Sequence, residues 1–191
     1  MTYNIPNLLT LLRIGSIPVF VVVFYLPVGW SNVAATAIFG LAAVTDWLDG
    51  YMARRLGQIS AFGAFLDPVA DKLMIAVALV VLLQTSPTIW FAIPAGIIIG
   101  REIAISALRE WMANIGGRTK VTVSVIGKIK TTMQMIALLL LLYQEPLWSF
   151  PTQVAGIVCL YVAATLTLWS MFLYLRAAWP TLAAESRPGA D

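Results

Sequence analysis

Residues 46–71 contain the sequence Asp46-Trp-Leu-Asp49-Gly50-Tyr-Met-Ala53-Arg54 and, after eight further residues, Gly63-Ala-Phe-Leu-Asp67-Pro-Val-Ala-Asp71. The four aspartates lie in a chain of 191 residues of which 60% are hydrophobic and only 11% are charged. Carboxylates are costly in or beside hydrocarbon, so four of them in one short stretch require a compensating positive charge. We expect a pair of divalent metal ions to supply that charge.

Length and composition indicate a single domain that is an integral membrane bundle of helices. The composition lies far from that of soluble globular domains. The sequence contains no histidine, which excludes a histidine base, a histidine metal ligand and every Ser-His-Asp arrangement. Cys159 is the only cysteine, so the chain forms no internal disulfide, and we interpret this residue as inert packing. We expect no nucleic acid partner.

Six apolar segments indicate membrane-spanning helices. They cover residues 14–30, 32–51, 65–85, 89–108, 131–143 and 153–175. The fifth is short, and we expect its helix to begin near Val123. Residues 1–13 predict a short amphipathic interfacial helix. The predicted fold is therefore all-α and integral to the membrane: six transmembrane helices plus this N-terminal helix form a domain over residues 1–176, and residues 177–191 form a cytoplasmic tail.

Basic residues are distributed asymmetrically along the chain. The connections at residues 27–31, 86–88 and 144–151 contain no Lys or Arg, whereas all 12 basic residues fall on the other side or in the adjoining helix ends. The positive-inside rule then places both termini in the cytoplasm. Trp30, Trp90 and Trp148 adjoin the uncharged connections, as an outer aromatic belt would. This topology puts the four aspartates at the cytoplasmic ends of the second and third spans.

The spacing places each pair of aspartates on one helix face. Asp46 and Asp49 are three residues apart, and Asp67 and Asp71 are four apart. Glycines between the two pairs allow the chain to turn back, so two helix ends would present four carboxylates to one volume. A two-metal site needs that arrangement, and all-oxygen ligands favour Mg²⁺ or Mn²⁺.

The small residues of the same stretch would let a bulky ligand lie against the helix backbone. Gly50 and Ala53 are about one turn apart, and Gly63 lies on the next helix. Arg54 can form a forked contact with a phosphate oxygen. The alternatives are that the small residues serve helix packing and that Arg54 is a topology anchor.

The complete spacing, D-x2-D-G-x2-A-R-x8-G-x3-D-x3-D, resembles the signature of the CDP-alcohol phosphatidyltransferase family, and all eight fixed positions match. Members of that family are six-helix membrane enzymes. They transfer a phosphatidyl or similar phosphoalcohol group from a CDP-linked donor to an alcohol acceptor and release CMP. The alternative, in which the aspartates are helix caps and topology charges, leaves most of the fixed positions without a role.

The resemblance also implies roles for individual residues. It implies that Asp46, Asp49, Asp67 and Asp71 hold two divalent cations, Mg²⁺ or Mn²⁺, and that Asp71 is the general base for the acceptor hydroxyl. It further implies that the donor, CDP-diacylglycerol, is bound by residues from the N-terminal helix and from the motif. These are Asn7, Thr10, Gly50, Ala53, Arg54, Ser60 and Gly63.

A second group of charged residues lies in the fourth and fifth segments. Arg101 and Arg109 are about two helical turns apart and can line one face. We expect Glu102 to serve another helix, because adjacent residues of a helix do not face each other. Several cations suit an acceptor that already carries a phosphate, and the alternative is contact with lipid headgroups.

The segments around these charges resemble bacterial members of the family whose acceptor is sn-glycerol 3-phosphate. This implies phosphatidylglycerophosphate as the product and the bacterial inner membrane as the location, with the site on the cytoplasmic side. It also implies an acceptor site made by Arg109, Lys128, Arg101 and Lys130.

Other functions remain open at this point. The same chemistry can act on a serine-type or inositol-type acceptor, which would not require several cations. A membrane prenyltransferase also uses aspartates with Mg²⁺, but its two motifs lie farther apart. A divalent-cation transporter would place polar residues deeper along several helices. Small-residue helix faces favour a homodimer. We also expect membrane lipids to contact the apolar helices.

Overall fold

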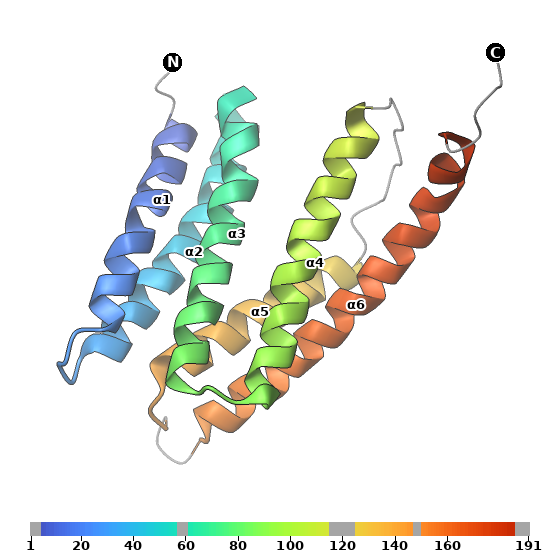
Figure 1. Ribbon diagram of the computed structural model, residues 1–191. Helices are drawn as coiled ribbons and strands as arrows, with labels where there is room; N and C mark the ends of the chain where they lie inside the picture. Colours follow the sequence, from blue (N-terminus) through green and yellow to red (C-terminus); the bar gives the residue numbers. More distant parts are fainter. Residues whose placement is uncertain (1–4, 57–60, 115–124, 147–149, 186–191) are drawn as a thin grey trace.

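Six α-helices make up nearly all of the structure (Figure 1). The computed structural model describes residues 5–56, 61–114, 125–146 and 150–185. The helices are α1 Ile5–Phe24, α2 Ser31–Leu56, α3 Ala61–Thr85, α4 Ile89–Asn114, α5 Val125–Tyr143 and α6 Thr152–Glu185. The predicted all-α fold is therefore confirmed over these ranges.

The first predicted span is displaced along the chain. The structure has no break near residue 13, and α1 runs continuously from Ile5 to Phe24. It ends there because the chain turns before Pro27: the Leu26 amide donates to the Val23 carbonyl, which tightens the last turn. The described part of residues 1–13 is thus the start of a longer helix, and a separate interfacial helix is not confirmed.

The other predicted segments each lie within one helix. The fifth helix begins at Val125, close to the expected start near Val123. The sixth continues to Glu185, so the first part of the predicted tail is helical.

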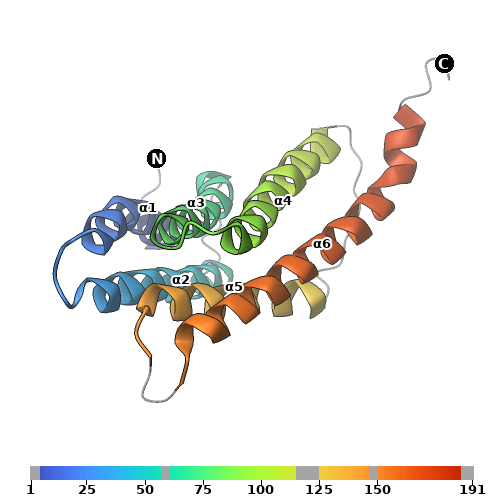
Figure 2. The ribbon, with the colours of Figure 1, turned by 60° about the horizontal axis from the view of Figure 1, so that its bottom comes forward.

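The helices form two layers, and successive helices along the chain run in opposite directions. Figure 2 shows α1, α3 and α4 in one layer and α2, α5 and α6 in the other. Helix α5 packs most extensively against α6, followed by α1 against α2. Helix α4 also packs against α6. In Figure 1 the starts of α1 and α3 and the ends of α4 and α6 lie at the upper end. The three connections without basic residues follow α1, α3 and α5, at the opposite end.

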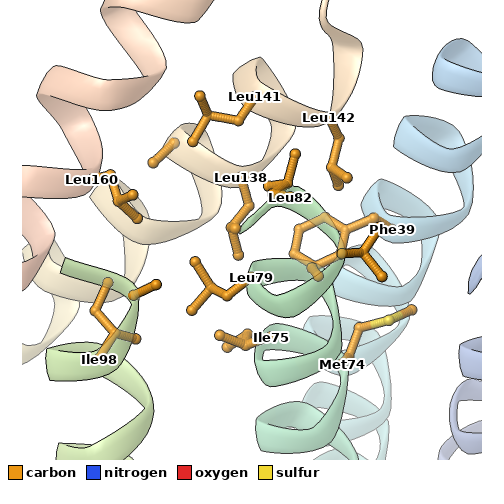
Figure 3. Packing of buried hydrophobic residues seen from close by; sticks show 14 of the residues in the cluster. Phe39, Met74, Ile75, Leu79, Leu82, Ile98, Leu138, Leu141, Leu142 and Leu160 are labelled. Carbon is orange, nitrogen blue, oxygen red and sulfur yellow. The ribbon is translucent and has the colours of Figure 1, made fainter. Parts of the chain in front are cut away.

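The core fills the space between the two layers (Figure 3). Phe39 of α2, Leu79 of α3, Ile98 of α4, Leu138 of α5 and Leu160 of α6 are all almost completely buried. Phe20 of α1 belongs to the same cluster, so all six helices contribute and the core holds the two layers together.

The outer surface is strongly apolar. Leu41, Val80, Trp90, Val154 and Phe172 are each more than half exposed, a surface that suits lipid and not water. Within the residues that the structure describes, three helices are long and apolar enough to cross a membrane, over Asn7–Phe24, Ile89–Met112 and Thr152–Ala177. Ile129–Tyr143 is a shorter apolar helix. The chain is a membrane protein, and the count of six spans stays a prediction.

Candidate functional site

The aspartate motif lies on the second half of α2 and the first half of α3. Asp46 belongs to α2, and Asp67 and Asp71 belong to α3. Asp49 is part of α2, but its side chain lies outside the described residues. The start of α1 lies at the same end of the bundle as the start of α3 (Figure 1). The helices α1, α2 and α3 therefore all contribute polar residues at this end.

The first helix holds a carboxylate from each of its two neighbours. The Thr10 hydroxyl donates a hydrogen bond to Asp67 Oδ1. Arg13 Nη1 forms an ion pair with Asp46 Oδ1 at 2.5 Å. Both α1 residues are almost completely buried, with Arg13 only 2% exposed. These contacts fix the side chains of Asp46 and Asp67 relative to each other, because one rigid helix carries both partners.

Asp71 has a different environment from the other two carboxylates. It is partly buried, and none of the described side chains donates a hydrogen bond to it. It lies within electrostatic range of Asp46 and Glu102 as well as Arg13 and Lys72. Asp71 and Arg13 line a small cavity of about 10 Å³, which is close to the space that one water molecule needs. Its carboxylate is thus available to a small ligand.

The described carboxylates match the chemistry of a hard divalent cation, although they do not by themselves complete a site. Among the described side chains, no group of three or more acidic, histidine or cysteine residues could hold a metal ion. Asp46 and Asp67 donate only oxygen ligands, which suit Mg²⁺ or Mn²⁺. The predicted set also includes Asp49, whose side chain is not described, so the four-carboxylate cluster stays a prediction.

The residues predicted to bind the donor are only partly described. Asn7 is buried and lies one turn before Thr10 on α1, and Gly63 is buried near the start of α3. Gly50, Ala53 and Arg54 belong to α2, but their side chains lie outside the described residues, and so does all of Ser60. The structure therefore brings the N-terminal element to the aspartates and leaves the nucleotide contacts as predictions.

The predicted acceptor cluster is partly assembled. Glu102 Oε1 accepts hydrogen bonds from Arg101 Nη1 at 2.8 Å and from Lys130 Nζ at 2.5 Å. This joins α4 to α5, as expected for Glu102, but the neighbouring Arg101 also reaches the same oxygen. The expectation that adjacent residues do not meet was therefore wrong here, because the long arginine side chain curls back along the helix. The side chains of Arg109 and Lys128 lie outside the described residues.

Arg13 contacts the aspartate motif, but the sequence did not single it out as a site residue. It was taken only as one of the basic residues that orient the chain in the membrane. A signal was present, because Asn7, Thr10 and Arg13 are each three residues apart, which puts three polar side chains on one face of an apolar helix. Such a stripe in a membrane helix indicates a polar partner inside the protein.

The chain is similar to known proteins over most of its length. The family described as CDP-alcohol phosphatidyltransferase matches residues 3–174. The chain is 55% identical over 186 residues to the CDP-diacylglycerol–glycerol-3-phosphate 3-phosphatidyltransferase of Pseudomonas fluorescens, covering 96% of this chain and 94% of the relative. It is 57% identical over 178 residues to the protein of the same name from Escherichia coli K12, covering 93% of this chain and 96% of the relative. The chain therefore belongs to the CDP-alcohol phosphatidyltransferase family, whose members are enzymes.

Proposed function

We propose that this enzyme transfers the phosphatidyl group from CDP-diacylglycerol to sn-glycerol 3-phosphate, giving phosphatidylglycerophosphate and CMP. The names of the two relatives support the two substrates. The proposal is carried by two contacts from α1 to Asp67 and Asp46, and by the electrostatic coupling of Asp71 to Glu102, which binds the cations Arg101 and Lys130. An acidic site for a metal-bound diphosphate and a basic site for a phosphorylated alcohol are the two parts that this reaction needs.

In this proposal the aspartates form the donor site. Asp46, Asp49, Asp67 and Asp71 would hold two divalent cations, Mg²⁺ or Mn²⁺, which when bound would neutralise the diphosphate and polarise its phosphorus. Thr10 and Arg13 keep Asp67 and Asp46 in place. Asn7, Gly50, Ala53, Arg54, Ser60 and Gly63 are assigned to the CDP group.

Asp71 is assigned as the general base. The acceptor hydroxyl oxygen forms a bond to the phosphorus that carries diacylglycerol, the phosphoanhydride bond to CMP breaks, and the hydroxyl proton passes to the Asp71 carboxylate. The Asp71 side chain is partly exposed and lines a small cavity, which supports this role. Arg101, Arg109, Lys128 and Lys130 are assigned to the phosphate of the acceptor.

The proposal also includes the arrangement in the membrane. Six spans would place the aspartates and both termini on the cytoplasmic side of a bacterial inner membrane, where the charged substrates are water-accessible. The exposed apolar faces would contact lipid or a second copy of the chain.

The test measures CMP release by the purified protein in detergent micelles that contain CDP-diacylglycerol. We expect release to require both glycerol 3-phosphate and a divalent cation, to stop with EDTA, and to fall by about 10²-fold or more in Asp71→Asn, as expected for loss of a general base. Serine and inositol are offered in parallel. Turnover with either of them in place of glycerol 3-phosphate would reject the assigned acceptor, and full turnover in EDTA would reject the metal assignment.

A further inference from the structure

A buried ionic cluster joins three helices beside the aspartate site. Arg101 and Glu102 come from α4 and Lys130 comes from α5, while α6 contributes Ser170, whose hydroxyl oxygen accepts a hydrogen bond from Arg101 Nη2 at 3.0 Å. The side chains of Arg101, Lys130 and Glu102 are 12%, 8% and 22% exposed. Glu102 is the centre of the cluster because one of its oxygens accepts from both cations.

The composition of this cluster differs from that of a simple structural ion pair. Burying charges is costly, and a pair that serves only packing needs one cation for each carboxylate. Here one carboxylate oxygen of Glu102 contacts two cations, Arg101 and Lys130. In addition, Arg101 Nε and the Thr167 hydroxyl are buried and have no hydrogen-bond partner in the described part of the chain. A buried arginine N–H without a partner in the described residues, beside two cations that share one carboxylate, is suited to an anionic ligand.

The same glutamate is connected to the helix that carries the assigned base. The Lys72 ammonium donates to the Ser106 hydroxyl oxygen, and the Ser106 hydroxyl donates to the Glu102 carbonyl oxygen at 2.5 Å. Lys72 directly follows Asp71 on α3. The chain of contacts thus runs from the α3 helix to α4, and through the Glu102 side chain to α5. The Glu102 backbone is thereby linked to α3 at the residue that follows Asp71.

We infer that Glu102 is a positioning residue that holds Arg101 and Lys130 as a pair for the phosphate of the acceptor, and so makes the enzyme select phosphorylated alcohols. The inference rests on the proposed function and deepens it. Without the carboxylate, two cations in a poorly hydrated space repel each other and separate, and the pair no longer fits one phosphate group. Ser170 supports the arrangement by fixing the second guanidinium nitrogen of Arg101.

The main experiment compares Glu102→Gln with the wild-type enzyme. Each variant is assayed for CMP release while glycerol 3-phosphate and CDP-diacylglycerol are varied separately. We expect the KM for glycerol 3-phosphate to rise about tenfold, the effect of weakening contacts between charged groups, while kcat and the KM for CDP-diacylglycerol change less than about twofold. Inorganic phosphate serves as a second probe, and its inhibition constant against glycerol 3-phosphate should rise in parallel.

Two further variants control the result. Glu110→Gln removes an exposed carboxylate from the same helix and should leave every constant unchanged. Ser170→Ala removes one bond to Arg101 and keeps both charges, so it should raise the KM for glycerol 3-phosphate about threefold, in the range of one ordinary hydrogen bond. This second variant also tests the idea if Glu102→Gln does not fold.

Several outcomes would overturn the inference. One is an unchanged KM for glycerol 3-phosphate in Glu102→Gln, or in Ser170→Ala if only that variant folds. Another is an equal loss for both substrates, which indicates a purely structural role. Failure of the proposed function is distinguishable, because the wild-type enzyme itself would then release CMP without any dependence on glycerol 3-phosphate.

Discussion

The hydrogen bond from Thr10 to Asp67 makes a specific prediction about metal binding. Thr10 lies in α1 and is completely buried, and its hydroxyl donates to Asp67 Oδ1 on α3. A group that orients a metal ligand by a hydrogen bond typically contributes about 10- to 100-fold to metal affinity or activity. We therefore expect Thr10→Val, which keeps the shape of the side chain and removes the donor, to weaken the response to Mg²⁺.

The magnitude follows from the kind of bond that is lost. A hydrogen bond to a charged group contributes about 1.5–3 kcal/mol, which corresponds to roughly 10- to 150-fold in an equilibrium constant. Asp67 is only partly buried and water can replace the donor in part, so we expect the lower end, about tenfold. Thr10→Ser keeps the hydroxyl and should stay close to the wild-type enzyme.

The assay is CMP release titrated with Mg²⁺ at saturating concentrations of both substrates, and the measured quantity is the Mg²⁺ concentration at half-maximal rate. Thr36→Val is the matched control, because the Thr36 hydroxyl donates to the Asn32 carbonyl of its own helix at 2.7 Å. If Thr10→Val needs no more Mg²⁺ than the wild-type enzyme, Thr10 does not act through Asp67. A raised KM for CDP-diacylglycerol alone would instead favour the donor contact that the family resemblance implies.

Two further predictions concern stability in detergent, measured as the midpoint of thermal unfolding. A Cβ atom at Gly156 of α6 would lie 2.7 Å from Leu141 Cγ of α5, so Gly156→Ala should lose about 1 kcal/mol after the gain in helix propensity is subtracted. At Gly96 nothing lies within 4 Å of the added atom, so Gly96→Ala should be neutral or stabilising, and a lower midpoint for it would contradict the reasoning. Arg13→Met should lower the free energy of unfolding in EDTA by about 1 kcal/mol and so lower the midpoint, because Asp46 is 41% exposed and water screens much of the pair. Mg²⁺ should then raise the midpoint of Arg13→Met more than that of the wild-type enzyme, and equal shifts would show that Arg13 does not balance the charge of the metal site.

The positions of the helices along the chain could be predicted from the sequence to a large extent. Long apolar runs determine where a membrane helix forms, so α2, α3, α4, α5 and α6 each contain a predicted segment. The first span was misplaced for the same reason. Its polar residues at Asn7, Thr10 and Arg13 made the N-terminal part seem interfacial, whereas the structure buries those side chains against α2 and α3. Hydropathy measures the residues of one helix and contains no information about the polar partners that neighbouring helices supply.

The pairing of charges also could not be predicted from the sequence of a single helix. Spacing rules describe where Cβ atoms lie on a single helix, and by that measure Arg101 and Glu102 point apart. An arginine has a long flexible side chain, and a buried guanidinium gains far more from a charged partner than an exposed one, so it bends to reach the carboxylate. Lys130 then reaches the same oxygen only because α4 and α5 are held at a particular distance, which the whole bundle packing decides. In an apolar bundle such as this one, the sequence therefore identifies which residues need partners, and the packing of the helices selects the partners. A buried charge that has been assigned only to topology, as Arg13 was, is for that reason better treated as part of a site until its partner is known.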